Sequence, residues 1–113
     1  MEVKINAKVK KVDVGEEKAT VKIRLPTWLI RETEILSMQG KDRISVEMDG
    51  VTVTGKFKKV TIGEEDAIIP LKIDTEAIKH TNILDIIGKE DIAIIFNDNQ
   101  TTLDDHIEKE GEE

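Results

Sequence analysis

The sequence lacks several residue types on which protein chemistry often depends. It has no cysteine, which excludes disulfide bonds and cysteine-ligated metal sites and is typical of a reducing compartment such as the cytoplasm. Its only aromatic residues are Trp28, Phe57 and Phe96, too few to form a stacking platform for single-stranded nucleic acid. Its apolar runs are far too short to cross a bilayer, so we expect no membrane partner.

Groups suited to catalysis are equally scarce. There are two histidines, His80 and His106, and we expect His80 to lie on an exposed helix position. No phosphate-binding loop, nucleophile elbow or dinucleotide fingerprint is present. Adjacent carboxylates such as Glu16 and Glu17 fall in a predicted turn, where a solvated charge is the ordinary interpretation. We therefore expect no enzyme activity and no cofactor.

One segment has the spacing of calcium ligands. Asn97, Asn99, Thr101 and Glu108 match the first, third, fifth and twelfth positions of a calcium-binding loop. Thr102 occupies the sixth position, where the sharp turn of such a loop requires glycine. We therefore predict no metal site.

The negative charge is concentrated at the C-terminus. The chain has a net charge of −7, of which −6 belongs to Asn97–Glu113. A polar segment with few large apolar residues does not bury enough surface to offset its ordering entropy. Residues 98–113 are therefore predicted to form a disordered acidic tail, and residues 1–97 a single domain.

The most informative feature is an internal repeat. "KVKKVDVGEEKA" at Lys8–Ala19 returns as "KFKKVTIGEEDA" at Lys56–Ala67, 48 residues later. The match extends without a gap over Lys8–Asp49 and Lys56–Asn97, and more than a third of the aligned positions are identical. Two copies are too few for a stacked solenoid. We interpret residues 2–49 and 50–97 as duplicated half-domains that complete one core.

Each half has the same expected order of elements, β-β-α-β. An alternating strand, in which Val3, Ile5 and Ala7 share one face, changes phase after Val9, which predicts a β-bulge or sharp bend. A Gly-Glu-Glu turn, a second alternating strand and a short helix capped by Thr27, or by Asp74 or Thr75 in the second half, come next. A left-handed glycine, Gly40 or Gly88, precedes the third strand, and Asp49-Gly50 predicts a tight hairpin between the halves.

Six strands and two short helices favour a closed six-stranded barrel, because closure removes exposed strand edges. The element order, the duplication and the matching endings "ILSMQGKDRISVEM" and "ILDIIGKEDIAIIF" resemble the cradle-loop barrels of the double-psi and RIFT types, which are built from two β-β-α-β halves. The resemblance implies a mainly β fold with two short helices over residues 2–96. A two-layer α+β sandwich is the alternative.

The two halves differ on their predicted surfaces, and this difference motivates two functional hypotheses. The second half has an extra apolar face, and Trp28 stands where the other copy has Glu76. The first hypothesis is a non-catalytic module that contacts another protein or a second copy of itself. Its candidate contact residues are Trp28, Ile68, Pro70 and Ile87.

The alternative hypothesis is a small accessory protein that binds nucleic acid and is inhibited by its own acidic tail. Its candidate residues are the outward-facing cations of the first two strands: Lys4, Lys8, Lys10, Lys18, Lys22 and Arg24. Lysines on strand faces also prevent aggregation, so these residues alone do not decide the function. The small size and acidic composition are compatible with an accessory gene of a phage or mobile element.

Overall fold

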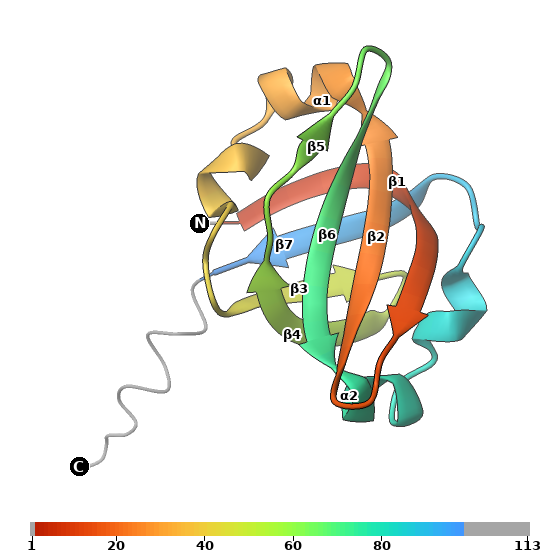
Figure 1. Ribbon diagram of the computed structural model, residues 1–113. Helices are drawn as coiled ribbons and strands as arrows, with labels where there is room; N and C mark the ends of the chain where they lie inside the picture. The colour runs from red at the N-terminus through yellow and green to blue at the C-terminus, as the bar shows by residue number, and fades with distance from the viewer. Residues whose placement is uncertain (1, 99–113) are drawn as a thin grey trace.

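The computed structural model describes residues 2–98 (Figure 1). It is mainly β, and its elements follow the same order in both halves except for one additional short strand, β5, in the second. The first half contains β1 (Glu2–Val14), β2 (Lys18–Pro26), α1 (Thr27–Glu32), a 3₁₀ turn at Ile35–Met38 and β3 (Ile44–Met48). The second half contains β4 (Val51–Phe57), β5 (Thr61–Ile62), β6 (Asp66–Asp74), α2 (Thr75–Lys79), a 3₁₀ turn at Ile83–Ile86 and β7 (Ile92–Asn97).

Six of the seven strands close into an antiparallel barrel. The strand order is β2-β1-β7-β3-β4-β6, and β6 pairs with β2 to complete the ring. The short strand β5 pairs with β6 on the side opposite β2, following β4 (Figure 1). The predicted six-stranded barrel is therefore confirmed, with one strand more than expected.

Strands β1 and β4 each belong to two parts of the barrel wall. The first half of β1, from Glu2 to Ala7, pairs with β7, and the second half, from Lys8 onward, pairs with β2. In the same way β4 pairs with β3 up to Gly55 and then with β6 at Lys56 and Phe57. Each of these strands must therefore bend as it passes from one neighbour to the next.

The predicted bend is present in both halves. In β1 the register shifts between Val9, which pairs with Ile23, and Lys11, which pairs with Lys22, so β1 contains one extra residue. In the second half Phe57 pairs with Leu71, but Thr61 pairs with Ile68, and one extra residue again lies on the bent side. An extra residue bends a strand and increases its twist, which small barrels need at their corners.

Pro70 occupies the position in β6 that faces the break between β4 and β5. Its carbonyl oxygen accepts a hydrogen bond from the Lys58 amide at 2.9 Å, so its nitrogen, which has no hydrogen, points to the same side. The missing donor therefore removes no bond between Pro70 and its partner Lys22 on β2. Pro70 therefore lies in a strand that has hydrogen-bonded neighbours on both sides.

The barrel encloses one continuous apolar core to which both halves contribute. The alternating side chains of the long strands point inward, and Phe57 and Phe96 meet at the centre with ring centroids 5.8 Å apart. Other fully enclosed side chains come from both halves: Ile23, Leu25, Ile35, Met38, Ile44, Met48, Ile69, Leu71, Ile73 and Ile83. Neither half alone encloses these side chains, because strands from the other half cover them.

The two predicted short helices are present, and each is followed by a second helical turn. Each half has one or two turns of α-helix followed by a separate 3₁₀ turn, rather than a single helix. In the first half the 3₁₀ turn buries Ile35 and Met38 and leaves Leu36 exposed. Gly40 and Gly88 follow these turns with φ of +89° and +88°, which confirms their predicted left-handed conformation.

Thr27 does not cap α1, contrary to the prediction. Its hydroxyl instead donates to the carbonyl oxygen of Gly63 at 2.8 Å, in the turn between β5 and β6. Its amide donates to the carbonyl oxygen of Glu65 at 2.8 Å. Both bonds join the start of a first-half helix to a second-half turn.

Thr75, at the start of the second-half helix, makes the equivalent hydrogen bonds to a first-half turn. Its hydroxyl and its amide donate to the carbonyl oxygens of Gly15 and Glu17, both at 2.9 Å, in the turn between β1 and β2. The predicted caps from Asp74 or Thr75 are absent, since no side chain caps α2. Positions 48 residues apart thus make equivalent bonds, and each half fastens its helix to the hairpin of the other.

The hairpin between the halves has the predicted geometry. Asp49 and Gly50 both adopt positive φ, 51° and 86°, and join β3 to β4 with Met48 opposite Val51. Two successive positive φ values match the right-handed twist of the flanking strands.

We predict that Thr27→Val lowers the free energy of unfolding by about 1–3 kcal/mol, because the carbonyl of Gly63 loses its donor in a partly buried place. The equivalent substitution Thr75→Val breaks an exposed bond, whose carbonyl water can reach, and should have the smaller effect. Urea unfolding of the two variants followed by circular dichroism measures both values. Equal losses of stability in the two variants, or a larger loss for Thr75→Val, would contradict this account of the threonine hydrogen bonds between the halves.

Candidate functional site

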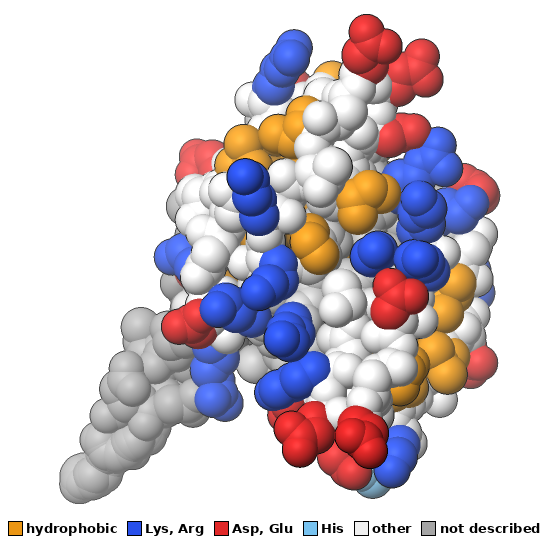
Figure 2. Space-filling view, viewed as in Figure 1, with side chains coloured by type: hydrophobic (Ala, Val, Ile, Leu, Met, Phe, Trp, Pro, Cys, Tyr) orange, Lys and Arg blue, Asp and Glu red, His pale blue; other side chains and the backbone are white. Residues whose placement is uncertain are grey.

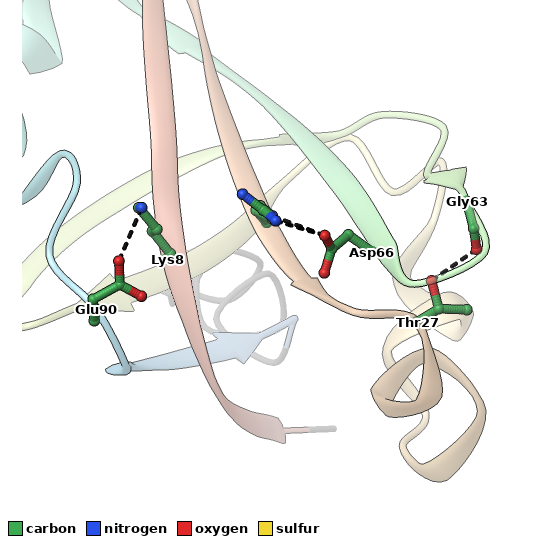
Figure 3. Close-up of polar contacts among 6 residues, drawn as sticks. Lys8, Thr27, Gly63, Asp66 and Glu90 are labelled. Carbon is green, nitrogen blue, oxygen red and sulfur yellow. Dashed lines mark hydrogen bonds and ion pairs between the residues drawn. The ribbon is translucent and has the colours of Figure 1, made fainter.

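The barrel wall is open at the corner where β1 and β2 separate. The two strands are paired from Val14 opposite Ala19 up to Lys8 opposite Arg24. Beyond this point β2 stays paired with β6 as far as Pro26, whereas β1 continues along β7 (Figure 1). Figure 3 shows the two ribbons diverging from the level of Lys8.

A groove of about 800 Å³ lies in this corner, and we call it the β1 groove. One side is formed by β1 from Lys4 to Lys8, and the other by Arg24–Pro26, Trp28 and Leu29. Glu90 and Asp91, which precede β7, and Asp66 complete the lining. A second, smaller groove lies at the equivalent corner of the other half, as described below.

The floor of the groove contains an unpaired strand edge. Residues Lys4 to Ala7 pair with β7 on one side only, and within residues 2–98 no backbone hydrogen bond reaches their other side. Every second residue of an antiparallel strand turns its amide and carbonyl away from a given neighbour. The groove therefore contains backbone donors and acceptors that are available to a binding partner.

Trp28 stands beside this edge. Its side chain is 61% exposed, more than any other large apolar side chain among the described residues. It follows β2 at the start of α1, whose position is fixed by the two bonds of Thr27. An exposed tryptophan on a fixed backbone next to a groove is typical of a contact anchor.

Charges in the groove balance one another. Lys8 is paired with Glu90 at 3.0 Å, and Arg24 donates to Asp66 at 2.7 Å (Figure 3). Asp91 adds one further negative charge and Lys4 one positive charge. Lys4 has no ion-pair partner within the described part of the chain, and its neighbour on β7 is the apolar Ile95.

A smaller groove occupies the equivalent corner of the second half. It measures about 350 Å³ and lies where β4 leaves β6, between Thr54–Lys56 and Lys72–Asp74. Lys18, Asp42 and Arg43 complete its lining, and they correspond to Asp66, Glu90 and Asp91 of the β1 groove at an offset of 48. The repeat thus generates two related grooves, of which one is wide.

Two of the sequence differences between the grooves concern the tryptophan and the closeness of the strands. Trp28 is replaced by Glu76, and Ala7 by Gly55. A methyl group on Gly55 would overlap the carbonyl oxygen of Lys72 and lie 2.7 Å from Cγ2 of Ile73, so glycine allows β4 to approach β6 closely. At the matching point of β1, Ala7 carries a methyl group and is buried.

The predicted protein-contact residues do not form one patch. Ile68 and Pro70 lie on the outer face of β6 and are half-buried, opposite Arg24 and Lys22 of β2. Ile87 contacts Val9 across a bridge on the far side of β1, so two strands separate it from Ile68. Of the four residues, only Trp28 lies in the β1 groove.

Most of the predicted basic residues are already paired with carboxylates. Besides Lys8 and Arg24, Lys18 is paired with Asp74, and Lys22 with Asp13 at 3.6 Å. Lys4 and Lys10 have no such partner within residues 2–98. Figure 2 shows basic side chains in separate groups with apolar surface between them, and acidic side chains at the two ends of this face.

The remaining candidates lie outside both grooves. His80 is exposed at the end of α2, with Nε2 3.3 Å from the carboxylate of Glu76. Asp98, the last described residue, is hydrogen-bonded to Lys41, which lowers the pKa of its carboxyl below the usual value. Residues 99–113, with most of the acidic tail and of the calcium-like spacing, lie outside the described residues.

Residues 2–98 lack two other kinds of feature. No group of three or more histidine, cysteine, aspartate or glutamate residues is placed to hold a metal ion in this part of the chain. No helix in it has the length and apolar character that a membrane crossing requires.

Comparisons of the chain with protein-family models, with curated proteins and with solved structures give no match.

Sequence reasoning identified several residues of the groove but not the groove itself. Trp28, Lys4, Lys8 and Arg24 were singled out, but they were divided between two hypotheses and belong to one place. No sequence pattern indicated that Glu90 and Asp91 line the groove, because they belong to a loop that is distant from β1 and β2 along the chain. The one available signal was the pair of differences at Trp28 and Ala7 between otherwise similar copies.

We predict that Gly55→Ala lowers the free energy of unfolding by about 1–3 kcal/mol, because the methyl group overpacks the contact between β4 and β6. The control is Ala7→Gly, which introduces no overlap and should cost about 1–2 kcal/mol through backbone entropy and the loss of one buried methyl group. Urea unfolding measures both values. If Gly55→Ala were neutral, the close approach that narrows the second groove would be contradicted.

Proposed function

We propose that this protein is a non-catalytic binding module and that another protein docks in the β1 groove. The observation that supports this most strongly is the unpaired edge of Lys4–Ala7 beside the exposed Trp28. An apolar anchor next to free backbone groups suits a protein partner, which can supply both a pocket-filling side chain and backbone hydrogen bonds.

The groove has features of a contact site rather than of an active site. Two of its three carboxylates, Asp66 and Glu90, are paired with Arg24 and Lys8. The histidine that the structure describes, His80, lies on α2 and not in the groove. These features support a binding role without catalysis.

Nucleic acid has less support as the partner. A phosphate backbone requires unneutralised cations along its path. Four of the six predicted cations are paired with carboxylates, and the charges in the β1 groove cancel. The nucleic-acid hypothesis, with the acidic tail as internal inhibitor, therefore stays the second choice.

Three further proposals rest on sequence and fold together. The β-β-α-β order of the first half, which the second half repeats with one additional short strand, and the closed barrel support a relationship to the cradle-loop barrels. The absence of cysteine supports a cytoplasmic location. The small size and acidic composition support an accessory role in a phage or mobile element.

The full chain, used as bait in an extract of its source organism, tests the proposal when it is compared with Trp28→Ala. We expect Trp28→Ala to reduce capture of the partner at least about tenfold, as truncation of a central anchor does. The matched control Leu84→Ala removes another exposed side chain on a different segment and should leave capture unchanged. Light scattering of the purified chain distinguishes a different partner from a second copy. Equal capture by all three proteins would contradict a role for the groove.

A further inference from the structure

We infer that the occupant of the β1 groove is an extended segment of a partner protein, which adds as a strand to the free edge of β1. This inference rests on the proposed function and specifies the form of the partner. The free edge, Lys4–Ala7, is about 13 Å long at about 3.3 Å per residue, which suits a short extended segment. Main-chain hydrogen bonds would supply affinity, and the groove walls would supply specificity.

The side of β2 offers less unpaired backbone than β1. The pairing of β1 with β2 ends at Arg24, and beyond it Pro26, which has no N–H, can offer only its carbonyl oxygen toward β1. A strand placed in the groove would therefore continue the sheet from β1 toward β2. The corner at which the barrel wall opens is the place where one more strand fits.

The groove walls favour a single strand over a second copy of this protein. Trp28 and Leu29 rise on one side of the edge, and Glu90 and Asp91 on the other. In a second copy the same edge would lie between the same walls. Two such edges could not approach to the strand spacing of about 4.8 Å without moving both pairs of walls, whereas a free extended segment carries no walls.

The lining also predicts the side chains of the segment. Successive residues of a strand face opposite sides, so alternate residues would face Ile5, Ala7 and Leu25, which are buried and apolar. These residues of the partner should be apolar. The others would lie beside Lys4 and Asn6, and Lys4 has no carboxylate partner within residues 2–98. An acidic residue opposite Lys4 would supply the missing cross-strand pair.

A library of random dodecapeptides displayed on phage and selected on the full chain tests this inference. We expect the enriched peptides to alternate apolar and polar residues and to contain an acidic residue at one polar position. Binding of a synthesised peptide is followed by the fluorescence of Trp28, the only tryptophan in the chain. The emission should shift to shorter wavelength as the side chain leaves water.

Two matched pairs of variants locate the bound peptide. Lys4→Glu should weaken binding about tenfold or more, whereas Lys10→Glu changes another exposed lysine of the same strand outside the groove and should have little effect. Trp28→Ala should weaken binding by a similar or larger factor, and Leu84→Ala should not. Backbone amide exchange measured by NMR should show new protection at alternate residues of Lys4–Ala7 when the peptide is bound.

The results separate this inference from the proposed function. If no peptide is enriched, or if the protected amides lie outside β1, strand addition is wrong. Binding that depends on Trp28 without protection of the β1 edge would also overturn strand addition while leaving a docking role for the groove. If a natural partner is captured independently of Trp28, both proposals fail.

Discussion

The nine residue pairs between β2 and β6 are the constraint from which the rest of the structure follows. They join the two halves along the full length of both strands and close the barrel. Beyond Lys8 and Arg24 the two strands diverge, since β2 follows β6 as far as Pro26 and the first half of β1 follows β7. A groove at the corner between them is the geometric result of closing a six-stranded ring with strands that change neighbours.

The same constraint makes the halves depend on each other. The first-half helix starts at bonds to the second-half turn, and the reverse holds for Thr75. Phe57 and Phe96 meet at the centre, and the strands around them belong to both halves. A symmetric arrangement of this kind produces two corners, so a change at only a few positions suffices to make one of them a binding site and leave the other narrow. Trp28 and Ala7, with Glu76 and Gly55 as their counterparts, are such positions.

Much of the fold was predictable from the sequence because local patterns determine it. Alternation gave the strands, Asp49-Gly50 the central hairpin, and the phase change after Val9 the bend. The threonine bonds were missed because a hydroxyl that caps its own helix and one that reaches a distant turn look alike in sequence. The position of Ile87, two strands away from Ile68, depends on strand order, which no local pattern specifies. The groove escaped prediction for the same reason, since Glu90 and Lys8 are brought together only when the barrel closes.

The account depends most on one claim, that the edge of Lys4–Ala7 is unpaired in an otherwise closed barrel. Backbone amide hydrogen exchange of the full chain without a partner, resolved by NMR, tests it most directly. The amides of alternate residues that point away from β7 should exchange orders of magnitude faster than their neighbours that bond to β7. Uniform slow exchange from Lys4 to Ala7 would show that this edge is already paired, and would contradict the account.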